Sequence, residues 1–484
     1  MRLLFVTPQV TPYSGASPAG DACWALPKAL KSRGHEVTIL SPLYGFIDPA
    51  AKHLARRLRK IEVPLEDGPT AFQVFDARIA AGIDLVFLAH EELFAPCESV
   101  PRGGDPTEDP LEDGRRFGAF CKAAMELLRS DDEGFDAVHC HEWQTALVPV
   151  LVDLEELEPA TVMTVHDVSR QGRFAPELVQ RLALPERLLG IEGIEFYGKA
   201  CFLKGGVVEA DRVTTMSPTY AREITEDGGG AGLEGVFRAR GKELVGITGG
   251  VDVAVWNPAT DAQLPARFDP MDRSGKRRCK AALQRELELP VRDDVPLIGV
   301  LGPLNEDAGL DVLARVVSRV MRNDVQLVVV GEGGAADDSL VAVLREHSKR
   351  WPDRLQLQAE GGDEAVHRLL GGADALMLPP HQPPGGSMQM RAHRYGALPI
   401  GARAGAVADT VVDCDASLTT GDGFLYDLDE DGAVADDEVL AALQRAIAAF
   451  ALGGAFEKAR ERALRTDHTW ERSAYLYERL YASV

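Results

Sequence analysis

Short apolar runs rich in β-branched residues alternate with amphipathic stretches along this chain, and that alternation restricts its fold more than any other feature. Between two such runs, the stretch 20–34 places Ala22, Leu26 and Leu30 on one face of a helix. Strands that alternate with helices form parallel sheets, because right-handed crossovers lay helices against both faces. A first series of strands is expected at 3–7, 36–41, 83–89, 137–141, 162–166 and 212–217. The chain is therefore predicted to be α/β, with doubly wound parallel sheets.

The same alternation begins again in the second half of the chain. A second series of strands is expected at 296–302, 325–333, 355–359, 373–378 and 398–402. With 484 residues the chain exceeds the size of one ordinary core, so two Rossmann-like domains are expected. The predicted boundaries are an N-terminal domain at 1–250, a Pro-rich linker at 251–275, a C-terminal domain at 276–460 and a terminal helix at 461–484. The strand ends of the two domains are expected to face a central cleft.

Charge and cysteine content exclude several classes of partner. The chain has 52 Lys and Arg against 75 Asp and Glu, a formal net charge of −23. Such a charge repels nucleic acid and anionic membranes, so neither is an expected partner. The seven cysteines are dispersed without a C-x-x-C pair, which is typical of reduced thiols in a cytoplasm. The apolar run after Arg2 is too short for a signal peptide, and no run is long enough to span a membrane.

The segment LPPHQPPGGSMQ, at 378–389, lies between an expected strand and an expected helix. It holds four prolines, two glycines and no acid. Loops in this position commonly hold a ligand at the start of a helix, where free N–H groups favour anions. The loop is therefore a candidate anion site.

Several segments resemble bacterial glycogen synthase and plant starch synthase, in order and over nearly the whole chain. They include HCHEWQTALVPV, TVHDVSRQG, FLKGGVVEADRVTTMSPTYAREI, GPLNEDAGLD and RYGALPIGARAGAVADTVVD. The resemblance implies a GT-B fold, with the acceptor on the N-terminal side and the nucleotide sugar on the C-terminal side. It implies retaining transfer of glucose from ADP-glucose to the non-reducing end of an α-1,4-glucan, without a metal or other cofactor. The leaving diphosphate would be met by Arg, Lys and backbone N–H groups.

The family's chemical motifs are altered in this chain. Its K-T-G-G-L-G-D motif begins here with Gly15 in place of the lysine. Its S-R-L-T-D-Q-K-G motif has Pro303 for the arginine and Ala308 for the lysine. In the loop at 378–389, Pro383 stands where the family has an acidic residue credited with a catalytic role, so no catalytic residue is assigned. Losing one charge-stabilising contact typically lowers a rate by about 10²–10³, so a combined loss of roughly four powers of ten is expected.

Other positions keep the family's residues or can play similar roles. Retained substrate-binding candidates are Gly20, Asp21, His166, Gln171, Gly386 and Ser387. Structural roles remain open for three of them: Asp21 and Ser387 as helix N-caps, and His166 as a core histidine. Cations that could replace the lost ones are Arg170, Lys204, His381 and Arg391, with Arg394 beside the last.

Two functions follow from these residues. The first is a glucosyltransferase that uses ADP-glucose, much weakened by the motif changes. The second is a non-catalytic relative that binds α-1,4-glucan or regulates a true glycogen synthase. The pair His139 and His141 could face one side of a strand, but no third metal ligand accompanies them, so packed or cleft-rim histidines are favoured and no metal site is expected.

Overall fold

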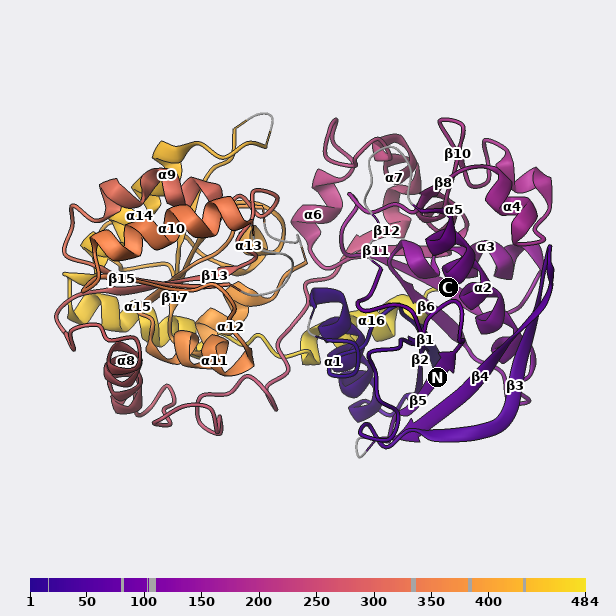
Figure 1. Ribbon diagram of the computed structural model, residues 1–484, viewed down its shortest axis with the longest axis horizontal. Helices are drawn as coiled ribbons and strands as arrows, with labels where there is room; N and C mark the ends of the chain where they lie inside the picture. Colours follow the sequence, from indigo (N-terminus) through magenta and orange to yellow (C-terminus); the bar gives the residue numbers. More distant parts are fainter. Residues whose placement is uncertain are drawn as a thin grey trace. The chain divides into compact units, whose positions relative to one another are not determined.

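The computed structural model describes residues 1–15, 17–79, 82–101, 103, 110–331, 337–381, 385–429 and 432–484. These residues form two compact α/β units (Figure 1). The first unit comprises Met1–Gly249 together with Trp470–Val484, and the second comprises Gly250–Thr469. The last helix of the chain thus belongs to the first unit, whereas the sequence suggested a separate element at 461–484. The expected linker at 251–275 lies within the second unit.

The first unit is built on a sheet of nine strands in the order β12-β11-β7-β6-β1-β2-β5-β4-β3. Its strands are β1 (Arg2–Val6), β2 (Glu36–Leu43), β3 (Ala55–Leu65), β4 (Gly68–Arg78), β5 (Asp84–Ala89), β6 (Ala137–His141), β7 (Ala160–Val165), β11 (Arg212–Thr215) and β12 (Leu244–Gly246). All neighbours pair in parallel except β3–β4 and β4–β5, which are antiparallel. The six strands expected in this half are confirmed, and the hairpin β3–β4 extends the sheet beyond them.

Helices cover the parallel part of this sheet, where strands such as β1, β6 and β7 are almost completely buried. They are α1 (Pro18–Ser32), α2 (Leu111–Arg129), α3 (Leu147–Leu154), α4 (Glu177–Arg181), α5 (Phe202–Glu209), α6 (Pro218–Glu223), α7 (Glu234–Arg240) and α16 (Glu471–Tyr481). Short 3₁₀ turns occur at Trp143–Thr145, Glu186–Leu189 and Gly241–Glu243. A small antiparallel sheet joins β8 (Arg173–Phe174), β10 (Lys199–Cys201) and β9 (Glu195–Phe196). The rings of Tyr477 and Tyr481 on α16 are fully buried in the core of this unit.

The second unit has a parallel sheet of six strands in the order β15-β14-β13-β16-β17-β18. This is the strand order of a Rossmann sheet. The strands are β13 (Leu297–Gly302), β14 (Gln326–Gly331), β15 (Leu355–Gln358), β16 (Ala375–Met377), β17 (Leu398–Ala402) and β18 (Phe424–Tyr426). The first five confirm the expected second series.

Helices cover both faces of the second sheet and enclose two apolar clusters (Figure 1). The helices α9 (Asp311–Val320), α10 (Asp338–Arg350) and α14 (Asp436–Phe450) enclose one cluster. The helices α8 (Ser274–Glu286), α11 (Asp363–Gly372), α12 (Met388–Arg394) and α13 (Gly405–Thr410) lie around the other, and α15 (Gly454–Arg465) contributes to both. In the described residues no single helix is long and apolar enough to cross a membrane; α14 and α15 pass such a test only as a pair bent by 111°.

Candidate functional site

Each sheet has a topological switch point, where the chain turns from one side of the first strand to the other. In the first unit it lies between β1 and β6, and in the second between β13 and β16. Ligands of open α/β sheets bind beyond the carboxyl ends of the strands at such points. The loops that follow these strands hold most of the candidate residues, so the fold brings them together within each unit.

After β1, the loop that resembles the family's lysine loop leads into helix α1. Gly15 has φ +84°, a left-handed conformation in which a side chain is strained. Ser17, rather than Asp21, is the N-cap, and its hydroxyl accepts the N–H of Gly20 at 2.9 Å. Pro18 has no N–H at all, so among the first three helix residues only Ala19 can donate to an anion.

Gly20 and Asp21 lie in the first turn of this helix. A Cβ atom on Gly20 would come within 2.9 Å of the Thr11 hydroxyl, so the position requires glycine. Asp21 is half-buried, and its backbone N–H donates to the Ser17 carbonyl at 2.8 Å. The alternative of Asp21 as the N-cap was therefore wrong, since Ser17 has that role.

On the other side of the switch point, three histidines lie in a buried row: His139 and His141 on β6, and His166 directly after β7. The Nδ1 of His141 is 3.1 Å from the Nε2 of His166, and the ring of His139 lies 4.2 Å from that of His141. His139 is held by the Tyr481 hydroxyl at 2.7 Å and the Thr164 hydroxyl at 2.6 Å. It is thus a packed histidine, as favoured from the sequence. Burial lowers the pKa of His166 to about 4, so the ring is neutral near pH 7.

Glu142 follows this strand and fixes the position of His166. Its backbone has φ 66°, an unusual conformation outside glycine that is often found at functional sites. Its carboxyl oxygen accepts the backbone N–H of His166 at 2.8 Å. Burial, with the charge of Asp167 nearby, raises the pKa of Glu142 to about 8. The Nδ1 of His166 and the Nε2 of His141 are buried and have no hydrogen-bond partner among the described residues.

The remaining candidates of the first unit have structural contacts. The amide group of Gln171 donates to the carbonyls of Val168 and Ala231, at 3.1 and 3.0 Å. The ammonium of Lys204 donates to the carbonyls of Ile191 and Gly193, at 2.6 and 2.9 Å, and its side chain is buried. Arg170 is half-exposed and forms an ion pair of 3.0 Å with Asp167. Of the two first-unit cations, only Arg170 is open to solvent.

In the second unit, the loops after β13 and β16 pack against each other. The backbone N–H of His381 donates to the Ala308 carbonyl at 3.1 Å, and a Cβ atom on Gly309 would lie 3.1 Å from Pro380. Ala308 is buried and Pro303 is half-buried. Pro383 lies outside the described residues.

Helix α12 begins directly after the second of these loops. Ser387 occupies its N-cap position, but its side chain makes no capping hydrogen bond. Gly386 is buried, and its carbonyl accepts the side-chain amide of Gln389 at 2.9 Å. The Gly386–Ser387 backbone thus remains near the start of a helix without a side-chain cap.

Arg391 lies on α12 within an aromatic cluster that sequence reasoning missed. Its guanidinium lies over the Trp256 ring at 4.1 Å, and that ring stacks on His367 at the same distance. His367 and the Tyr395 hydroxyl share the carboxylate of Asp261, at 2.6 and 2.5 Å. These residues are far apart in sequence, so no local pattern could have revealed the cluster. Arg391 is buried, whereas His381 is exposed.

The arrangement offers polar contacts for a ligand but few cations. Among the candidate residues of the first unit Arg170 is half-exposed, and among those of the second unit Arg394 is half-exposed and His381 is exposed. Within the described parts of the chain, no three His, Cys, Asp or Glu side chains are grouped as metal ligands. The buried, neutral histidines of the first unit are suited to binding hydroxyl groups rather than to neutralising a diphosphate.

Comparison with known proteins gives consistent matches over the whole chain. A family model described as the starch synthase catalytic domain matches residues 2–239. The chain is 37% identical to a glycogen synthase of Anaeromyxobacter sp. (strain Fw109-5), over 100% of the chain and 99% of that protein. It is 32% identical to a glycogen synthase of Geotalea daltonii, with 100% and 99% covered.

Solved structures agree with these matches. The catalytic domain of starch synthase IV from Arabidopsis thaliana, bound to ADP and acarbose, superimposes with a TM-score of 0.88 at 25% identity, covering 99% of this chain and 98% of that one. A sucrose-phosphate synthase from Thermosynechococcus elongatus has a TM-score of 0.61 at 15% identity, with 100% of both chains covered, which indicates a shared fold alone.

Proposed function

The chain belongs to the glycogen synthase and starch synthase family of GT-B glycosyltransferases, and from that membership we propose that it binds α-1,4-glucan while transferring glucose from ADP-glucose only weakly or not at all. The structure of starch synthase IV holds ADP and acarbose, so both kinds of ligand are known in that relative. The proposal is that this chain has kept the sugar-binding side of the site and lost most of the diphosphate-binding side.

The observation that carries the proposal is the loop between β1 and α1. A lysine at position 15 would need the left-handed conformation that Gly15 adopts at φ +84°. The next donors along the loop are also reduced, because Pro18 has no N–H and the N–H of Gly20 is bound by Ser17. The loop therefore lacks the lysine and offers few free N–H groups, and both features disfavour a bound anion.

The second unit supports the same conclusion. Pro303 and Ala308 stand where the resemblance places an arginine and a lysine, and Glu306 and Asp307 between them are exposed. Two carboxylates beside a switch point make the local field unfavourable for a diphosphate. The site residues that could hold a sugar are the neutral His166, with its unpartnered Nδ1, and the backbone around Gly386.

A second candidate function is a working synthase that uses ADP-glucose. It is favoured by full-length identity of 37% to a glycogen synthase and by the presence of His381 and Arg394 near the loops of the second unit. In that case these residues and Arg170 would replace the lost cations.

The test is an assay of glucan-dependent ADP release from ADP-glucose, with the Anaeromyxobacter glycogen synthase as a positive control. We expect a rate lower than that of the control by about 10³ or more, on the scale of several missing charge contacts. The variant Pro303→Arg/Ala308→Lys should raise the rate or tighten ADP binding, because it restores two cations at one switch point. A rate within tenfold of the control would refute the proposal and establish the second candidate.

A further inference from the structure

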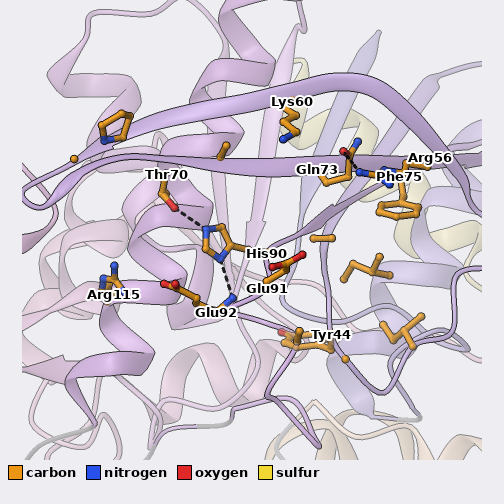
Figure 2. Close-up of a pocket in the computed structure, with 18 of the residues that line it drawn as sticks. Tyr44, Arg56, Lys60, Thr70, Gln73, Phe75, His90, Glu91, Glu92 and Arg115 are labelled. Atoms are coloured by element: carbon orange, nitrogen blue, oxygen red, sulfur yellow. Dashed lines mark hydrogen bonds between the residues drawn. The ribbon is translucent and has the colours of Figure 1, made fainter.

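Two of the hollows that lie away from the switch points differ in the charge of their lining. The larger, of about 780 Å³, lies in the first unit between the hairpin β3–β4 and the loops that follow β2 and β5 (Figure 2). Its charged lining residues are three cations and three acids, namely Arg56, Lys60, Arg115, Asp67, Glu91 and Glu92. These charges balance, so the hollow selects no charged ligand. The other, of about 530 Å³, lies beside helix α8 in the second unit (Figure 1), and its charges do not balance.

We call this second hollow the α8 groove; it is lined by one flank of α8, from Ser274 to Gln284, and by the loop residues Val291 and Asp293. The loop leads into β13, and the Gln284 side chain donates to that of Gln326, the first residue of β14, at 2.6 Å. The groove therefore lies at the amino ends of these strands, whereas the switch point lies beyond their carboxyl ends. The six residues of β13 span roughly 20 Å, so the two places are well separated.

The floor of the groove is held by the protein itself. The ammonium of Lys280 donates to the carbonyl of Val295 at 2.5 Å and to the carboxylate of Asp374 at 2.7 Å. The amide nitrogen of Gln284 donates to the carbonyl of Arg292 at 2.9 Å, which fixes the loop against the helix. The groove is thus formed in advance, and little ordering of the protein opposes binding.

Two guanidinium groups of the groove have no partner within the described residues. Arg277 and Arg278 are exposed on α8 and form no hydrogen bond or ion pair there. Asp272 lies close enough to Arg278 for its pKa to be lowered, but its carboxylate is occupied by the backbone N–H of Ser274, at 3.0 Å. Asp293 on the loop is also exposed and, in the part of the chain that the structure describes, unpaired. The unpaired side chains thus carry two positive charges and one negative charge, in a chain whose formal net charge is −23.

A phosphate monoester matches this distribution of charge. It carries about −1.5 to −2 near pH 7, and the planar N–H groups of two guanidinium groups pair with its oxygens. A monocarboxylate would leave one guanidinium group unmatched. A bare phosphate ion would fill only a small part of the 530 Å³, so the groove also admits an organic body over Ala281 and the exposed Val291. The carboxylate of Asp293 repels phosphate but accepts hydrogen bonds from hydroxyl groups, which favours a hydroxylated body on the loop side.

We propose that the α8 groove binds a small hydroxylated phosphate monoester, held by Arg277 and Arg278, at a site of the second unit separate from the switch point. The site goes beyond the proposed function and does not depend on it, because none of its residues belongs to the switch-point loops. An assay of ADP release therefore leaves this proposal unaffected, whichever way it turns out.

The experiment is a calorimetric titration of the full chain with ribose 5-phosphate, compared with ribose, inorganic phosphate and succinate. We expect ribose 5-phosphate to bind most tightly, and its affinity to fall as salt is raised. Arg277→Gln and Arg278→Gln should each weaken binding by about tenfold or more, the effect of a lost charge-assisted hydrogen bond. Arg285→Gln is the matched control: Arg285 is exposed on the same helix, has no hydrogen bond or ion pair among the described residues, and does not line the groove.

Several results would overturn the proposal. If neither ribose 5-phosphate nor inorganic phosphate bound, the two arginines would be merely solvated. Unchanged binding by both groove variants would place the phosphate elsewhere in the chain, and equal weakening by Arg285→Gln would show a diffuse effect of charge. Binding of inorganic phosphate or succinate as tight as that of ribose 5-phosphate would refute a hydroxylated phosphate monoester as the ligand. Thermal unfolding of each variant shows that the fold is intact, since all three arginines are exposed.

Discussion

Asp374 precedes β16 and is the centre of a buried ionic cluster in the second unit. Its carboxylate accepts from the ammonium of Lys280 at 2.7 Å, the guanidinium of Arg460 at 2.6 Å and the backbone N–H of Leu297 at 2.9 Å. The side chains of Lys280 and Arg460 are each only 4% exposed. The cluster thus joins α8, α15 and β13 to the strand that leads to the candidate loop at 378–389.

The variant Asp374→Asn removes the negative charge that Lys280 and Arg460 share; Arg460 keeps its ion pair with Glu457, whereas among the described residues buried Lys280 is left without a carboxylate partner. Removing one partner of a buried ion pair typically costs about 3–5 kcal/mol. That is a large share of the roughly 5–15 kcal/mol that stabilises a typical domain. With a urea m-value of about 2–3 kcal/mol/M, the unfolding midpoint of the second unit should fall by about 1–2 M.

Urea unfolding followed by tryptophan fluorescence measures this change, because Trp256 and Trp351 report on the second unit. Asp324→Asn is the matched control: Asp324 pairs with Arg292 at 2.9 Å, but the two side chains are 60% and 40% exposed. That surface pair should contribute less than about 1 kcal/mol. If Asp374→Asn destabilised no more than this control, the inference that the cluster organises the second unit would be wrong.

Three further predictions concern stability. The Nδ1 of His393 lies 2.8 Å from the Nε2 of His468, and burial lowers the pKa values of the two rings to about 4 and about 3. The unfolded chain therefore binds protons at a higher pH than the folded one, and the second unit should lose up to about 1.4 kcal/mol of stability per pH unit per histidine as pH falls from about 6.5 towards 4. Unfolding at pH 7 and pH 5 tests this, and His468→Gln should make the stability depend less on pH. Ser17→Ala should destabilise the first unit by about 1 kcal/mol through loss of the α1 cap, and an unchanged thermal midpoint would contradict that role. Gly172→Ala should destabilise the first unit by more than Ser17→Ala does, because Gly172 has φ +63° and a Cβ atom there would lie 2.4 Å from the Trp143 ring. A thermal midpoint equal to that of the unaltered chain would show that the loop can shift freely.

The sequence was least informative about the edge of the first sheet. The strand β3 is highly charged and is exposed on every residue from Ala55 to Lys60, so its sequence does not indicate a buried strand. The turn at Asp67-Gly68 between them is a recognised hairpin signal and could have revealed the pair. The irregularity of β3 between Arg56 and Lys60 could not have been found this way, because it depends on the register in which β3 pairs with β4.

By itself, the sequence determined the two α/β units and their parallel strands, because burial on both faces selects continuous apolar runs that are visible locally. It also determined which motif positions had changed, such as Pro303 and Ala308. Only the tertiary structure decided which retained residues are available to a ligand. Lys204 and Gln171 bind backbone carbonyls, Ser17 takes the capping role considered for Asp21, and α16 packs in the first unit. The physical reason is that a side chain binds residues distant in sequence, and local sequence patterns do not reveal which residues these are.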